Sequence, residues 1–107
     1  MGLFARTRKT DAKSLAERIA ARDVLVIDVR QPSEFRRGHI RGSMNVPLPH
    51  LSGRLHRIPQ GRPVVTVCAT GHRSAAAARV LERAGFEVEN LAGGVRAWAQ
   101  AGLALAR

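Results

Sequence analysis

The feature that most constrains the fold is a strand-like run that delivers the chain's only cysteine to the start of a helix. Residues Val64–Val67 form a β-branched run typical of a buried parallel strand. Cys68 follows, then residues 69–73 suit a tight loop, and Ser74 is expected to begin a helix that runs to about Arg83. Because a helix start is electropositive, this position favours a bound anion, and a thiolate at Cys68 is the anion the chain itself supplies.

The rest of the chain alternates strand-like and helix-like segments. Strands are expected over residues 24–28, 43–46, 64–67 and 88–91, and helices over 11–22, 31–38, 48–58, 74–83 and 94–102. This alternation predicts an α/β fold: one domain with a mainly parallel central sheet flanked by helices on both faces. Residues 1–10 are a basic segment, expected to be a short edge strand or a frayed end. Ligands of such folds sit beyond the carboxyl ends of the strands, where Cys68 falls.

Composition narrows the functional classes. The chain has 107 residues, a net charge of +10 and a single cysteine. One cysteine cannot form an internal disulfide, so we expect a reducing compartment, namely the cytoplasm. No apolar run reaches the length of a membrane span, and no membrane partner is expected. The positive charge suits a small anionic substrate. No nucleic-acid partner is expected, since the basic region lacks the aromatic residues on which bases stack.

The positive charge is concentrated around the cysteine. No acidic residue occurs between Glu34 and Glu82, whereas the same interval holds eight arginines, at positions 36, 37, 41, 54, 57, 62, 73 and 79. Most of these are interpreted as a solvated surface. Arg73 is the exception, because it belongs to the loop itself and is expected within reach of anything bound at Cys68.

Four motifs in order give the chain a family resemblance. They are Ile27-Asp28-Val29-Arg30 with Pro32, Glu34 and Phe35; Gly38-His39-Ile40 with Gly42, Asn45, Val46 and Pro47; Cys68-x-x-Gly71-x-Arg73-Ser74; and Leu91-x-Gly93-Gly94-x-x-x-Trp98. Together they span nearly the whole chain, which resembles a single-domain rhodanese, a sulfurtransferase module. The resemblance implies a rhodanese-like domain over residues 11–107.

The expected chemistry centres on Cys68. Backbone donors of the loop, the helix start and Arg73 should all favour its thiolate. The resemblance implies that Cys68 takes a sulfur atom from a donor such as thiosulfate, becomes a persulfide, and passes the sulfur to cyanide or a thiol. The substrate-binding residues are then those of the loop, Ala69, Thr70, Gly71, His72, Arg73 and Ser74. The competing interpretation, a buried and inert core cysteine, is disfavoured because the loop holds no large apolar residue to cover it.

Supporting roles are assigned to few residues. Asp28 ends a strand near the same sheet edge and is expected to accept hydrogen bonds that hold the loop backbone in place. His39 is interpreted as a structural hydrogen-bonding residue. With His50 and His56 it forms no recognisable ligand spacing, so neither a metal nor another cofactor is expected.

Two alternatives from other classes stay open. The first is a cysteine phosphatase or arsenate reductase, which also places a cysteine loop ending in arginine at a helix start. Against it, four residues separate Cys68 from Arg73, one fewer than in the phosphatases that resemble this fold. The second is a non-catalytic sulfur carrier or partner-binding module, with a protein partner in a sulfur relay.

Overall fold

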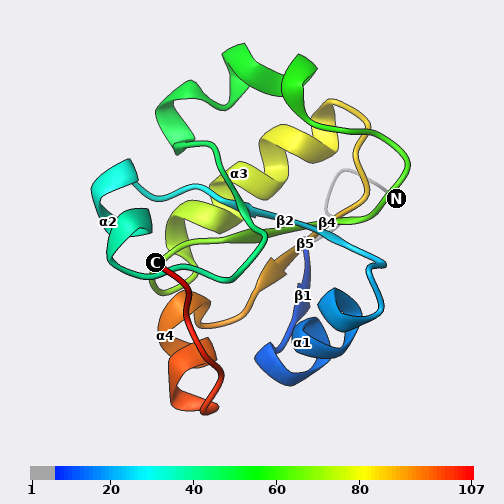
Figure 1. Ribbon diagram of the computed structural model, residues 1–107. Coiled ribbons are helices and arrows are strands. Elements are labelled where there is room, and N and C mark those ends of the chain that lie inside the picture. Colours follow the sequence, from blue (N-terminus) through cyan, green and yellow to red (C-terminus); the bar gives the residue numbers. More distant parts are fainter. Residues whose placement is uncertain (1–6) are drawn as a thin grey trace.

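A five-stranded, all-parallel sheet forms the centre of the computed structural model, which describes residues 7–107 (Figure 1). The strands are β1 (Arg8–Thr10), β2 (Leu25–Asp28), β3 (Met44–Asn45), β4 (Val64–Val67) and β5 (Val88–Leu91), in the order β1-β5-β4-β2-β3. The helices are α1 (Ala12–Ala20), α2 (Pro32–Arg37), α3 (His72–Arg83) and α4 (Gly94–Gln100), with 3-10 turns η2 (Leu48–His50) and η3 (Ser52–Arg57). The predicted α/β class is therefore confirmed.

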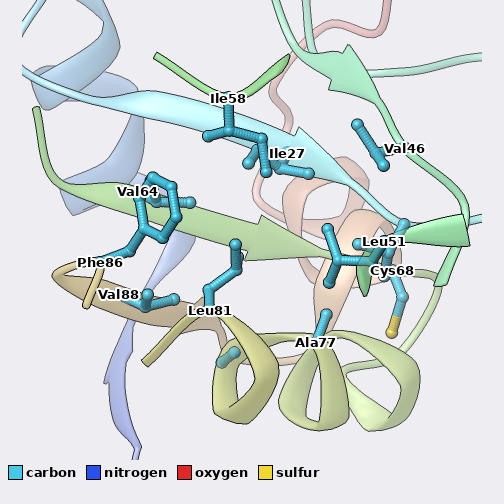
Figure 2. Close-up of a cluster of buried hydrophobic side chains, with 12 residues drawn as sticks. Ile27, Val46, Leu51, Ile58, Val64, Cys68, Ala77, Leu81, Phe86 and Val88 are labelled. Atoms are coloured by element: carbon cyan, nitrogen blue, oxygen red, sulfur yellow. The ribbon is translucent and has the colours of Figure 1, made fainter. Parts of the chain in front are cut away.

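Each face of the sheet is covered by its own set of helices. On one face lie α3 and the 3-10 turns, and on the other lie α1 and α4 (Figure 1). The alternation of side chains along the central strand explains both layers. Val64 belongs to the core under α3, while Val65 and Val67 belong to the core with Leu15 and Trp98 (Figure 2 shows the first of these clusters). All four residues of β4 are buried, as expected for a central parallel strand.

Two expectations about the elements need correction, and one is met in part. The segment 48–58 is not one helix but two 3-10 pieces, although Leu51 and Ile58 are buried as their spacing predicted. The main helix begins at His72 rather than Ser74, with Gly71 as its N-cap. Of the basic N-terminal segment, residues 8–10 form the edge strand β1, and residues 1–6 lie outside the described part of the chain.

The strand register brings the carboxyl ends of three strands, with Asp28 of β2 and Asn90 of β5, to one edge. Asp28 is paired with Val67 across β2 and β4, and Thr66 with Asn90 across β4 and β5. Cys68 directly follows this edge, so residues from β2 and β5 flank it. No helix within residues 7–107 has the length and apolarity needed to cross a membrane.

Candidate active site

The loop after β4 folds around the sulfur of Cys68. The Gly71 N–H donates to Sγ across 3.0 Å, and the Ser74 hydroxyl lies 3.2 Å from the same atom. Gly71 has φ +111°, a left-handed conformation that glycine adopts without strain, and this residue turns the chain from the loop into α3. Cys68, Gly71 and Ser74 therefore form a cradle whose donors converge on the sulfur.

Helix α4 holds this loop from the other side. The backbone N–H of Val95 donates to the Cys68 carbonyl at 2.8 Å, and that of Arg96 donates to the Ala69 carbonyl at 3.1 Å. These bonds need close approach at Gly94, where a Cβ would overlap the Cys68 carbonyl oxygen and lie 2.6 Å from the Ala69 carbonyl carbon. The Gly93-Gly94 pair thus has a packing role at the site that its sequence motif did not reveal.

Asn90 joins the two residues that contact the sulfur. Its Oδ1 accepts from the Ser74 hydroxyl at 2.6 Å, and its Nδ2 donates to the Gly71 carbonyl at 3.2 Å. The Ser74 hydroxyl carries one proton and stands within reach of two acceptors, Asn90 Oδ1 and Cys68 Sγ. Sequence reasoning missed Asn90, although an amide between Glu89 and Leu91 in an otherwise strand-like run was a usable signal.

The environment lowers the pKa of the Cys68 thiol. Burial opposes ionisation and by itself raises the pKa, but hydrogen bonds from the Ser74 hydroxyl and from the backbone N–H groups of Ser74, Gly71 and Thr70 outweigh it. The direction agrees with the expectation from sequence. The hydrogen bonds of the cradle are the main cause of the lowered pKa, and the Cys68 charge also interacts with that of Arg73.

The sulfur is more enclosed than we expected. Cys68 is 1% exposed and packs with the core that includes Leu51 and Ala77 (Figure 2). The cover comes from Leu51, which follows η2, and from Ala77 of α3 rather than from the loop, which has no large apolar residue, so the argument from loop composition was wrong. The side chain of Thr70 and that of His72 are exposed, and a cavity of about 420 Å³ borders both.

Arg73 does not extend over the cradle as a free cation. Its guanidinium donates two hydrogen bonds to the Glu34 carboxylate, Nη1 to Oε1 at 2.7 Å and Nη2 to Oε2 at 2.9 Å. Glu34 also accepts from the Gln31 N–H at 3.1 Å, which ties the pair to the start of α2. The Arg73 hydrogen bonds hold the pKa of Glu34 at about 2, so this carboxylate is ionised at neutral pH.

Asp28 lies at the expected sheet edge but has a different partner. It is 1% exposed and accepts from the Arg30 backbone N–H at 3.0 Å and from the Arg30 guanidinium at 2.8 to 3.1 Å. Arg30 in turn donates to the Gly38 carbonyl at 2.7 Å. The direct bonds from Asp28 to loop backbone that we expected are not seen within residues 7–107. Asn90 has that supporting position instead.

The remaining histidine expectations concern residues away from the sulfur. His39 Nδ1 donates to the Phe35 carbonyl at 2.8 Å, and its ring stacks on Phe35 at 3.8 Å between centroids, which confirms its structural role. In the described part of the chain, no three His, Cys, Asp or Glu side chains are grouped as a metal site would require.

Comparison with known proteins agrees with this architecture. The family model for the rhodanese-like domain matches residues 11–101. A sulfurtransferase of Allochromatium vinosum is 40% identical over 87% of this chain and 89% of its own length. Thiosulfate sulfurtransferase GlpE of Shewanella oneidensis is 35% identical over 81% of this chain and 87% of its own. A rhodanese-related protein from Thermoplasma volcanium superposes with a TM-score of 0.87 at 31% identity, covering 92% of this chain and 97% of that one.

These matches, the all-parallel sheet and the cysteine loop place the chain in one class, the rhodaneses. The chain belongs to the rhodanese-like domain family.

Proposed function

We propose that this protein is a sulfurtransferase that carries sulfane sulfur as a persulfide of Cys68. The convergence of Gly71 N–H and the Ser74 hydroxyl on Sγ supports the proposal most directly. These donors favour the thiolate, and the thiolate is the form of cysteine that attacks sulfur. A reducing compartment such as the cytoplasm suits this role, because it keeps the lone thiol reduced.

The reaction has two displacements. The Cys68 thiolate attacks the outer sulfur of a donor, the S–S bond of the donor breaks, and the leaving group departs with the electron pair, as sulfite does from thiosulfate. In the second step a thiolate or cyanide attacks the outer sulfur of the persulfide, and Cys68 leaves as the thiolate that the cradle already stabilises. Both steps conserve sulfur and electrons without a cofactor. The loop residues 69–74 are the proposed donor-binding residues.

Phosphate chemistry fits the same geometry less well. A phosphatase needs an acid to protonate the leaving alkoxide. The carboxylate that the fold brings to the loop is Glu34, and its pKa of about 2 leaves it without a proton at neutral pH. Asp28 is buried in its pair with Arg30. The structure therefore favours sulfur transfer over phosphate hydrolysis.

Intact mass after incubation with thiosulfate tests the proposal. The wild-type protein should gain one sulfur atom, lose it on addition of cyanide with formation of thiocyanate, and show negligible hydrolysis of aryl phosphates. Cys68→Ser should gain none. Sulfur that loads but passes to no thiol or cyanide would identify a carrier that needs a dedicated protein partner. Thiocyanate formation by Cys68→Ser, or phosphate hydrolysis that depends on Cys68 and outpaces sulfur transfer, would overturn the mechanism.

A further inference from the structure

Arg73, the cation of the cysteine loop, forms an ion pair with Glu34, a carboxylate from a different element. Arg73 belongs to the first turn of α3, whereas Glu34 belongs to α2, 39 residues earlier. Their two parallel hydrogen bonds form the bidentate arrangement that fixes both position and orientation. The side chains are 37% and 28% exposed, and the charge of Cys68 acts on Arg73, so the pair lies at the surface within electrostatic range of the sulfur.

A second ion pair lies beside the first. Arg30 and Asp28 are 8% and 1% exposed and joined at 2.8 Å. The two pairs interact electrostatically. The pKa of Glu34 is lowered chiefly by its hydrogen bonds from Arg73, and the charge of Arg30 adds to this effect. The pKa of Arg73 is raised chiefly by its hydrogen bonds to Glu34, and the charges of Cys68 and Asp28 add to this effect. Two arginines therefore face two carboxylates, and a thiolate at Cys68 adds one further negative charge to a balanced cluster.

We propose that Glu34 selects sulfur donors by charge, so that the site favours donors of low charge, such as an organic persulfide, over dianions. This inference rests on the proposed sulfur transfer. A dianionic donor must approach an anionic thiolate, and Arg73 would offset that repulsion if its charge were free. Glu34 cancels most of the positive charge of Arg73 at contact range. Arginines elsewhere on the surface attract anions from a distance, but salt screens them beyond about 10 Å at 0.1 M, so they steer rather than select.

Two donors with the same chemistry and different charge isolate the effect. Thiosulfate is a dianion that leaves as sulfite, and methanethiosulfonate is a monoanion that leaves as methanesulfinate. In both, the Cys68 thiolate bonds to the outer sulfur, the S–S bond breaks, and the leaving group takes the electron pair. The measured quantity is the ratio of kcat/KM for thiosulfate to kcat/KM for methanethiosulfonate, with cyanide as the acceptor.

Glu34→Gln keeps the size of the side chain and removes its charge. We expect the ratio to rise about threefold or more at low ionic strength, chiefly through a lower KM for thiosulfate, and the gain to shrink in high salt. Glu87→Gln is the matched control. It removes the same charge from a side chain that is 63% exposed, and the Glu87 carbonyl bonds to Val64 at the opposite end of β4 from Cys68. Its ratio should stay at the wild-type value.

Arg73→Gln provides an independent test in the opposite direction. It leaves Glu34 without its partner, so the ratio should fall below the wild-type value. Glu34→Asp retains the charge and should keep the ratio near the wild-type value even where a weakened contact with the Gln31 N–H, at the start of α2, lowers both rates together. That pattern distinguishes selection by charge from a merely structural role.

A ratio that does not rise in Glu34→Gln, or that does not fall in Arg73→Gln, would overturn the inference. If Glu34→Gln does not fold, the Arg73→Gln result alone decides. A wild-type protein that takes sulfur from neither donor would refute the proposed function itself. A wild-type protein that uses both donors, with a ratio insensitive to Glu34 and Arg73, would refute only the charge selection.

Discussion

Replacing Ser74 by alanine should raise the pKa of Cys68. The substitution removes the hydroxyl that stands 3.2 Å from the sulfur and leaves the backbone of α3 unchanged. Burial then still opposes ionisation, but one of the hydrogen-bond donors that offset it is gone. The N–H groups of Ser74, Gly71 and Thr70 remain. The thiolate therefore becomes harder to form at neutral pH.

The size of the shift follows from the hydrogen bond. A bond to a charged group contributes about 1.5 to 3 kcal/mol, and one pKa unit corresponds to about 1.4 kcal/mol. The single proton of Ser74 is shared between the sulfur and Asn90 Oδ1, so the lower end of the range applies. We expect the pKa of Cys68 to rise by about one unit.

The rate of alkylation by iodoacetamide as a function of pH measures this pKa, and the single cysteine makes the signal unambiguous. Thr66→Val is the matched control, because it also deletes a buried hydroxyl. That hydroxyl donates to the Ser74 carbonyl at 2.9 Å, and within residues 7–107 the hydrogen bonds to the sulfur come from Gly71 and Ser74 instead. If the pKa of Cys68 is unchanged in Ser74→Ala, or rises equally in Thr66→Val, the hydrogen bond from the Ser74 side chain does not set the stability of the thiolate.

Two further predictions concern stability. Gly94→Ala should lower the free energy of unfolding in urea by about 3 kcal/mol or more, because the added Cβ would meet the loop backbone. Gly85→Ala is the control: it is also at positive φ, but its added Cβ would have no atom within 4 Å, so it should cost only about 1 kcal/mol. Equal losses in the two variants would contradict the packing argument. Because the folded-state pKa of Cys68 lies below its ordinary value of 9.0, the thiolate contributes stability that is fully present above about pH 9 and lost as the pH falls through the folded pKa. The unfolding free energy of wild type relative to Cys68→Ser should therefore increase with pH across that window, and a flat difference would argue against the lowered pKa.

Sequence alone predicted the layers of the fold and the place of Cys68, because both depend on local patterns. The apolar runs of β2 and β4 are short-range signals of buried parallel strands, and the residues after Cys68 mark a strand-to-helix turn. The start of α3 was misplaced by two residues because Ser74, a good capping residue, binds Asn90 rather than capping the helix, and Gly71 takes the cap position.

The contacts that tune the site could not be predicted in this way. Arg73 meets Glu34 only because α2 and α3 converge at one edge of the sheet, and Cys68 is covered by Leu51 from a separate segment. Asp28 was placed at the correct edge, but Arg30, two residues later, donates to its carboxylate instead of the loop. The contacts of Arg73 with Glu34 and of Cys68 with Leu51 depend on distances between elements, which spacing along the chain does not encode.

The hydrogen bonds between α4 and the loop allow two backbone amides to be used to detect motion at the site. The N–H groups of Val95 and Arg96 are bonded to the carbonyls of Cys68 and Ala69, so each exchanges with solvent deuterium only when the loop separates from α4. Cys68 is 1% exposed and needs an opening to meet any large electrophile. Exchange at these amides and alkylation by bulky reagents would then measure the same local equilibrium, and persulfide formation would change both together.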